Sequence, residues 1–284
     1  MQTVTDSARL APFHGGVFVP TMGALHAGHA ALIRRAASIA SGAGLRVVVS
    51  IFVNPTQFND PADFARYPRT LEADAAIARG CGTDCLFVPA TEVVYPPGAA
   101  IPVPPLPAVG AEPGLEDALR PGHFEGVCQV CHRLFQLVRP SVAVFGEKDW
   151  QQLQVVSTMV ESLGMPLRIV PHETLREPGG LAMSSRNVRL SPSERVQALA
   201  ISRALVAAGR EATPAAAEAA ASRVLTDAAI TPEYAAVREA ASLGPLRSTG
   251  PSWPPARILI AARVGQVRLI DNAPWPGFEL PPPA

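Results

Sequence analysis

The sequence is poor in charge and carries no excess of either sign. Charged residues make up only 17% of the 284 residues, and the 24 Lys and Arg balance the 24 Asp and Glu. Proteins that bind nucleic acids or membrane surfaces normally show a basic excess, so this balance argues against both kinds of partner. A neutral chain can still carry a local positive cluster for an anionic small molecule.

Cysteines and long apolar runs are scarce as well. No run reaches the roughly 18 apolar residues of a membrane-spanning helix, and residues 1–10 show no apolar signal core. Four cysteines are too few for disulfide bonds to stabilise a chain of this size, so we expect a cytoplasmic protein with reduced thiols. The spacing of Cys81, Cys85, Cys128 and Cys131 leaves zinc as an alternative, but their apolar surroundings favour buried thiols.

Apolar residues reach 48%, enough for a substantial core and too many for a disordered chain. They fall in a strand–helix alternation through the first 170 residues, interrupted by an irregular, proline-rich stretch at 95–114. The expected strands are 16–20, 45–53, 85–88, 141–145 and 167–170, and the expected helices are 30–40, 70–80, 123–138 and 150–163. This α/β order predicts a doubly wound parallel sheet.

The pattern changes after residue 171. Two alanine-rich helices are expected at 192–209 and 214–228, followed by apolar runs at 258–264 and 266–270. A turn over 263–266 would join the two runs as a hairpin. We therefore predict two domains, 1–172 and a smaller α+β domain at 173–284.

Polar clusters follow three of the expected strands directly, at 21–29, 54–58 and 146–149. In an open parallel sheet, ligands bind beyond the carboxyl ends of the strands. The three clusters should therefore meet at one edge of the sheet, although they lie far apart in the sequence.

The first cluster favours an anion. His26 and His29 are three residues apart, so they share a face at the start of a helix, where the helix N-terminus attracts negative charge. Gly23 and Gly28 would let a ligand approach the backbone. Two alternatives remain open, a capped surface face and half of a metal site, but no third ligand is evident and phosphate is the better fit.

Two later segments suit the same anion. Lys148 follows a buried strand, and Ser184 and Ser185 stand beside Arg186, a natural phosphate clamp. The flexible glycines at 179–180 would let that clamp close as a lid. The alternatives are a solvated loop for Lys148 and a helix N-cap for the serines. A P-loop signature is absent, so any ATP is held differently.

Seven ordered motifs together resemble the pantothenate synthetase family, the pantoate–β-alanine ligases, over nearly the whole chain. They are PTMGALHAGH (20–29), SIFVNPTQF (50–58), YPRT (67–70), RPGHFEGV (120–127), FGEKDWQQL (145–153), LAMSSRN (181–187) and ILIAARVGQVRLIDN (258–272). The resemblance implies a Rossmann-like fold of the HIGH-motif nucleotidyltransferase type and, typically, a homodimer. It implies that (R)-pantoate and β-alanine condense through a pantoyl adenylate to form pantothenate. ATP, which brings Mg²⁺ with it, would be converted to AMP and pyrophosphate.

The resemblance also assigns residues. His29 would be the proton-donor histidine, Gln57 would bind pantoate and β-alanine, and Gln152 would bind pantoate. The implied catalytic set is His26, His29, Lys148 and Arg186. The implied ATP-binding set is Met22, Gly23, Ala24, Leu25, His26, Ala27, Gly28, His29, Gly146, Glu147, Lys148, Asp149, Leu175, Met183, Ser184, Ser185 and Arg186.

The chain departs from the family pattern in two places. Arg-Glu-Pro-Gly-Gly stands at 176–180 where the family has Arg-Glu-Ala-Asp-Gly, and Gln-Val-Cys stands at 129–131 where the family has Thr-Val-Val. Neither removes a position assigned above. A nucleotidyltransferase that stops after AMP transfer and a non-catalytic nucleotide-binding protein are the alternatives. The glutamine pair and the intact charged groups favour the ligase.

Overall fold

The structure is a computed structural model that describes residues 1–57, 64–65, 67–247 and 253–280. Phe58, the last residue of the second predicted polar cluster, lies outside this part. The chain forms two compact units. The first comprises Met1–Glu147 and Gln152–Glu173, and the second comprises Lys148–Gln151 and Thr174–Ala284.

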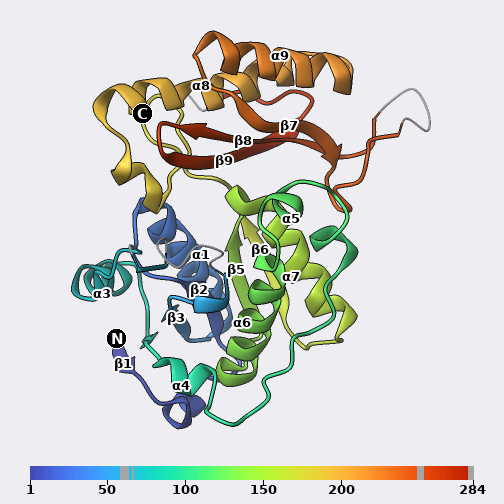
Figure 1. The fold of residues 1–284 in the computed structure, drawn as a ribbon. Helices are drawn as coiled ribbons and strands as arrows, with labels where there is room; N and C mark the ends of the chain where they lie inside the picture. The colour runs from blue at the N-terminus through green and yellow to red at the C-terminus, as the bar shows by residue number, and fades with distance from the viewer. Residues whose placement is uncertain (58–63, 66, 248–252, 281–284) are drawn as a thin grey trace. The chain divides into compact units, whose positions relative to one another are not determined.

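The first unit is built on a parallel sheet (Figure 1), as the alternation predicts. Its strands lie in the order β1-β4-β3-β2-β5-β6. Their bounds are β1 (Gln2–Val4), β2 (Val17–Thr21), β3 (Val47–Ile51), β4 (Cys85–Phe87), β5 (Val142–Gly146) and β6 (Arg168–His172). The predicted doubly wound sheet is confirmed, because the chain winds outward from β2 through β3 to β4 and outward from β5 to β6.

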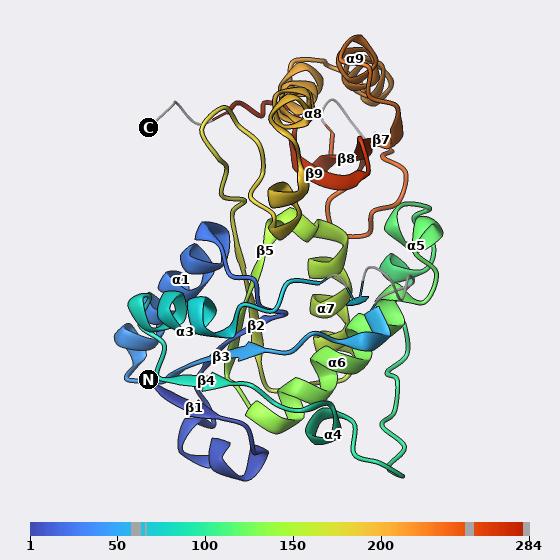
Figure 2. The same cartoon turned by 60° about the vertical axis from the view of Figure 1, so that its left-hand side comes forward.

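Helices cover both faces of this sheet (Figures 1 and 2). Helices α1 (Ala27–Ala43) and α3 (Leu71–Gly80) lie on one side, and α6 (His123–Val138) and α7 (Trp150–Ser162) on the other. Alternate residues of a strand point to opposite faces, so Val17 and Val19 join the core under α1. Phe18 points the other way, where its ring meets that of Phe135 on α6 edge-on at 6.2 Å.

Short elements fill the connections of the first unit. The proline-rich stretch 95–114 is irregular, as predicted, apart from one 3-10 turn. These elements are η1 (Ser7–Phe13), η2 (Pro55–Gln57), α4 (Thr91–Val94), η3 (Ala108–Gly110), α5 (Glu116–Leu119) and η4 (Glu147–Asp149).

The second unit is a small antiparallel sheet packed on two helices, which confirms the predicted α+β part. Its elements are η5 (Ser185–Arg189), α8 (Pro192–Gly209), α9 (Pro214–Asp227), β7 (Pro232–Glu239), β8 (Ala256–Val264) and β9 (Val267–Trp275). The sheet order is β7-β8-β9, and Val264 pairs with Val267 across the predicted hairpin turn. Alternate apolar residues of β8 pack against α8, whose N-terminus is closed by a capping box of Ser191 and Glu194.

Three features differ from the sequence expectations. Strand β1 has only three residues, too few for a periodic signal. Strand β7 has a short Ala-Ala-Val centre between charged residues and no apolar–polar alternation, so neither strand was predicted. Helix α1 begins at Ala27, three residues earlier than expected, because His26 caps it. The segment Lys148–Gln151 belongs to the second unit, although it directly follows a strand of the first.

Candidate functional site

The order of the first sheet reverses direction between β2 and β5. From these adjacent strands the chain continues to β3 on one side and to β6 on the other. Such a reversal opens a crevice at the carboxyl ends of the two strands, where ligands of α/β proteins bind. Residues 22–29 follow β2 directly, and residues 147–149 follow β5. Two of the three predicted clusters thus start at this switch point, and the third follows the neighbouring strand β3.

His26 and His29 form a reciprocal cap at the start of α1. The amide N–H of Gly28 donates to Nδ1 of His26 at 3.1 Å, and the N–H of His26 donates to Nδ1 of His29 at 3.3 Å. Each Nδ1 accepts a hydrogen bond, so each neutral imidazole carries its hydrogen on Nε2. The ring centroids are 4.1 Å apart. The structure therefore pairs two N–H donors at the positive end of a 17-residue helix.

The loop before these histidines is held by a carboxylate that the sequence analysis missed. Asp74 on α3 is 2% exposed, and its two oxygens accept the N–H groups of Ala24 at 3.0 Å and Leu25 at 2.7 Å. Gly23 has a φ of +83° and Ala24 a φ of +52°. A Cβ on Gly23 would lie 3.0 Å from Asp74 Oδ2, so this position requires glycine.

Gln57 is oriented by a buried asparagine. Asn54 is fully buried and donates from Nδ2 to Oε1 of Gln57 at 3.1 Å and to the carbonyl of Gly126 at 3.2 Å. Its Oδ1 accepts the hydroxyl of Tyr95 at 2.9 Å, and burial raises the pKa of that phenol. With Oε1 of Gln57 already accepting, the donor end of this side chain is the end suited to a substrate oxygen.

The N-terminal part of α6 presses against this segment. A Cβ on Gly126 would lie 2.4 Å from the carbonyl oxygen of Thr56, so only glycine permits the approach. His123, 7% exposed, contacts the carbonyl of Gln57 through Nδ1 at 3.1 Å. A carbonyl only accepts, so Nδ1 of His123 is the donor. Gln152 lies in the first unit as well, partly buried in the first turn of α7.

Of the remaining predicted residues, Gly146 and Glu147 end the first part of the first unit, and the others lie in the second unit. Lys148, with a side chain 18% exposed, has its ammonium 3.7 Å from Asp149. The carbonyl of Leu175 accepts the N–H of Met183 at 2.9 Å, which makes residues 175–183 a closed loop. Within that loop Gly179 and Gly180 have φ values of +94° and +98°, a backbone conformation that favours glycine.

Ser184 has a structural role beside any functional one. Its hydroxyl accepts the N–H of Arg186 at 3.2 Å and caps η5, the 3-10 turn that carries Ser185 and Arg186. The capping alternative is therefore correct for Ser184, but at η5 and not at α8, where Ser191 performs that task. A capping hydroxyl keeps one hydrogen to donate, so this role is compatible with phosphate binding.

The cysteines show no sign of a metal centre. All four are buried and unpaired, and burial raises the pKa of Cys85 to about 11 and that of Cys128 to about 12. Among residues 1–57, 64–65, 67–247 and 253–280, no three His, Cys, Asp or Glu side chains gather closely enough to hold a metal ion. In the same ranges, no helix combines the length and the apolarity that crossing a bilayer requires.

Comparisons with known proteins agree with the motifs. Residues 1–274 match the family described as pantoate-beta-alanine ligase. The pantothenate synthetase of Thioalkalivibrio sulfidiphilus is 47% identical, with 99% of each chain covered. A crystal structure of pantothenate synthetase from Thermus thermophilus is similar with a TM-score of 0.88 and 43% identity, covering 97% of this chain and 100% of that one. The ligase of Francisella tularensis, complexed with beta-gamma ATP and beta-alanine, is similar with a TM-score of 0.77 and 31% identity, covering 96% of this chain and 97% of that one.

Proposed function

The chain belongs to the pantoate–β-alanine ligase family, and from this we propose that it joins (R)-pantoate to β-alanine through a pantoyl adenylate. The observation that carries the proposal is the histidine pair at the N-terminus of α1, which presents two N–H donors beside the switch point of the sheet. The Francisella relative was crystallised with an ATP ligand and β-alanine. These are two of the three substrates proposed here.

Activation of the carboxylate explains why ATP is needed. A carboxylate repels nucleophiles and has no good leaving group, so an amine does not displace its oxygen in water. An oxygen of the pantoate carboxylate attacks the α-phosphorus of ATP and pyrophosphate leaves, which gives the acyl adenylate. The β-alanine amine then attacks the acyl carbon, loses a proton, and AMP leaves with the bridging oxygen. The products are pantothenate, AMP and pyrophosphate.

The charged residues act on the departing phosphates. Negative charge grows on pyrophosphate as the phosphorus–oxygen bond breaks, and donors that are already oriented stabilise it most. We assign this role to His26, His29, Lys148 and Arg186, with His29 as the proton donor. Ser184 and Ser185 bind phosphate oxygens, and the backbone of 22–29, 146–149 and Leu175 cradles the nucleotide.

The two glutamines bind the acid and the amine. A carboxamide both donates and accepts, which suits the hydroxyl and carboxylate groups of pantoate. Gln57 contacts pantoate and β-alanine, and Gln152 contacts pantoate. The support for Gln57 is its fixed orientation, because Asn54 occupies its oxygen and directs its donor end to a substrate.

Mg²⁺ is the cation that we propose for this reaction. Mg²⁺ usually keeps several waters and binds through substrate phosphates with one or two carboxylates. Bound there, it would neutralise phosphate charge.

We also propose that the protein works as a homodimer in the cytoplasm. The family resemblance supports the dimer, and the use of ATP and the unpaired state of all four cysteines support a reducing compartment. Sedimentation equilibrium should give a mass near twice the chain's 29.8 kDa. A monomer at micromolar concentration would contradict the dimer.

Pyrophosphate exchange tests the adenylate route directly. Labelled pyrophosphate should enter ATP when pantoate is present and β-alanine is absent, because the first half-reaction is reversible on the enzyme. Pantoate labelled with ¹⁸O in its carboxylate should transfer one label to AMP in the complete reaction. Formation of ADP with the label in inorganic phosphate would instead mean an acyl phosphate and would refute the proposal.

A further inference from the structure

We propose that Asn272 on β9 is a positioning residue for Lys148, which it acts on through the lysine's main-chain carbonyl. The inference rests on the proposed function, since it assumes that Lys148 binds the phosphates of ATP. It adds a role for the C-terminal sequence motif, whose Asp271 and Asn272 lie outside every set of site residues named above.

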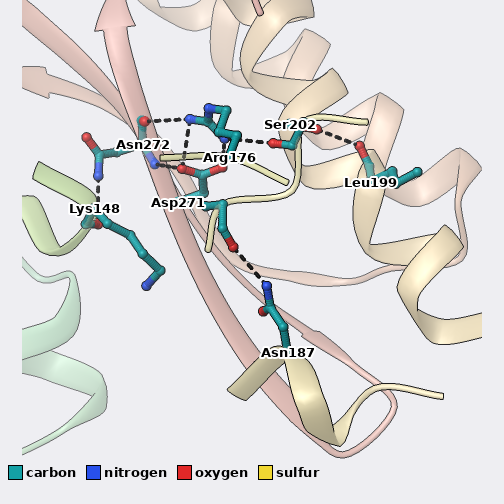
Figure 3. Close-up of polar contacts among 9 residues, drawn as sticks. Lys148, Arg176, Asn187, Leu199, Ser202, Asp271 and Asn272 are labelled. Carbon is teal, nitrogen blue, oxygen red and sulfur yellow. Dashed lines mark hydrogen bonds and ion pairs between the residues drawn. The ribbon is translucent and has the colours of Figure 1, made fainter. Parts of the chain in front are cut away.

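The contact itself is direct. Nδ2 of Asn272 donates to the carbonyl oxygen of Lys148 at 2.8 Å, across 124 residues of sequence. Figure 3 shows the carboxamide of Asn272 reaching this carbonyl while the side chain of Lys148 extends away from it. The bond therefore fixes the backbone of the lysine and does not engage its ammonium.

Asn272 is held rigidly in this orientation. It is 3% exposed, and its Oδ1 accepts Nε of Arg257 at 2.7 Å. These two partners establish which end of the carboxamide is oxygen and which is nitrogen, because a guanidinium can only donate and a carbonyl can only accept. An asparagine satisfies both at once. An aspartate has the same shape but no hydrogen for the carbonyl.

The same arginine also holds the tryptophan of the lysine's segment. The guanidinium of Arg257 lies 3.8 Å from the ring centre of Trp150, and Nε1 of Trp150 donates to the carbonyl of Ala240 at 2.7 Å. Arg257 and Asn272 thus anchor the segment Lys148–Gln151 at two points. This anchoring gives the physical reason why that segment belongs to the second unit.

The anchor is continuous with the segment that carries the other phosphate residues. Asp271 forms a buried ion pair with Arg176, whose Nη1 donates to the carbonyl of Gly180 at 3.0 Å. The next residue, Glu177, accepts Nδ2 of Asn187 at 2.7 Å, at the end of the 183–187 segment. Two adjacent residues of β9 therefore hold the Lys148 segment and the 176–187 segment in one body.

The alternation of side chains along β9 explains how two adjacent residues can hold two different segments. Consecutive side chains point to opposite faces, and Asp271 lies opposite Ile260, which belongs to the core under α8. Asn272 lies opposite Leu259, on the face that also bears Arg257. One dipeptide thus reaches both sides of the small sheet.

Asn272→Asp is the test variant, because it keeps the acceptor for Arg257, removes the donor to Lys148 and adds one negative charge. Arg263→Gln is its control: it lowers the net charge by the same one unit on the same sheet, at a side chain that is 60% exposed. We expect Asn272→Asp to lower the rate of pantoate-dependent pyrophosphate exchange by about 10- to 100-fold, the effect of a misplaced catalytic group. The KM for pantoate should stay within about twofold, and Arg263→Gln should match the wild type.

A double-mutant cycle distinguishes positioning from general damage. If Asn272 acts through Lys148, Asn272→Asp should have less than about a twofold effect on the residual exchange of a Lys148→Ala enzyme, because coupled residues are not additive. An equal fall in both backgrounds would overturn the proposal. So would a parallel rise in the KM for pantoate.

Hydrogen exchange supplies a readout that needs no substrate. Amides of residues 148–151 should exchange faster in Asn272→Asp than in the wild type, while those of α9 keep their protection. Unchanged exchange at 148–151 would overturn the proposal even if activity fell. Absence of pyrophosphate exchange in the wild type would refute the proposed function alone, since the hydrogen-exchange comparison would still decide the role of Asn272.

Discussion

His29 combines a local structural task with the proposed chemistry. Its Nδ1 accepts the N–H of His26 at the third position of α1, the place that glutamate or glutamine fills in an ordinary capping box. The opposite ring nitrogen then carries the hydrogen that we assign to the phosphates. One imidazole therefore orients itself for donation by capping its own helix.

Replacement of His29 should separate these two tasks. His29→Ala should lower the pyrophosphate-exchange rate by roughly 10²-fold or more and lower stability by about 0.5–2 kcal/mol through the lost cap. His29→Gln should restore most of the stability, because glutamine caps well at this position, but not the rate. Exchange kinetics and urea unfolding measure the two effects. Wild-type exchange in either variant would contradict the assignment to His29.

The cysteine thiols should be inert in the folded protein. Burial raises the pKa of Cys85 to about 11 and that of Cys128 to about 12, so both are protonated at pH 8, and only the thiolate reacts. Iodoacetamide at pH 8 should label the urea-unfolded chain rapidly and the native chain slowly, with or without a chelator. Faster native labelling after chelation would instead indicate a thiolate–metal centre.

These raised pKa values also give a pH dependence. Unfolded thiols ionise near their ordinary pKa of 9.0, whereas the folded ones hold their protons to higher pH. The folded state therefore binds more protons above pH 9. Its stability should be unaffected by these groups below that pH and should fall as the pH rises through the range from 9 to 12.

At the scale of elements, α3 supports the loop that precedes α1. The N-terminal turn of α3 carries Asp74, whose carboxylate accepts two backbone N–H groups and the hydroxyl of Thr70 at 3.1 Å. The loop has two consecutive residues with positive φ, Gly23 and Ala24. A backbone bent in this way needs external partners to stay in place.

Asp74→Ala should loosen that loop. Two backbone donors would lose their acceptor, at about 1–3 kcal/mol each where they stay buried, and both the melting temperature and the exchange rate should fall. Asp74→Asn keeps one acceptor oxygen, so its melting temperature and exchange rate should lie between those of the wild type and Asp74→Ala. Glu72→Ala, an exposed carboxylate in the same turn, is the matched control. Equal stability of Asp74→Ala and Glu72→Ala would rule out this role.

At the scale of the whole molecule, a buried ion pair holds the second unit together. Arg176 and Asp271 are 5% and 3% exposed and make two parallel contacts of 2.6 and 3.1 Å. The pair joins the 176–180 turn, near the start of the second unit, to the last strand of its sheet. Such a pair matters less for net stability than for the arrangement that it enforces.

Removing one partner of the ion pair should therefore destabilise the protein more than replacing both. Asp271→Ala leaves a buried guanidinium unpaired and should cost about 3–5 kcal/mol, whereas Arg176→Met with Asp271→Leu should recover a large part of that loss. Urea unfolding followed by tryptophan fluorescence would measure it. A double variant less stable than Asp271→Ala would contradict this account.

Most of the helices and strands, and the residues with a local signature, could be predicted from the sequence alone. Apolar runs such as 45–53 predict buried strands because a strand buried on both faces has no polar positions. The spacing of His26 and His29 places both at one helix turn, and the ordered motifs identify the family. Each of these signals is confined to a short stretch of neighbouring residues, where backbone geometry fixes the distances.

The distant residues that hold these local ones in place are apparent only in the folded chain. Asp74 reaches Ala24 across 50 residues, Asn54 reaches Gly126 across 72, and Asn272 reaches Lys148 across 124. A lone Asp or Asn has no periodicity, and its partner is a backbone N–H or carbonyl group, which identifies no particular residue. The strand order brings these partners together, so the attachment of Lys148 to the second unit could be read only from the folded chain.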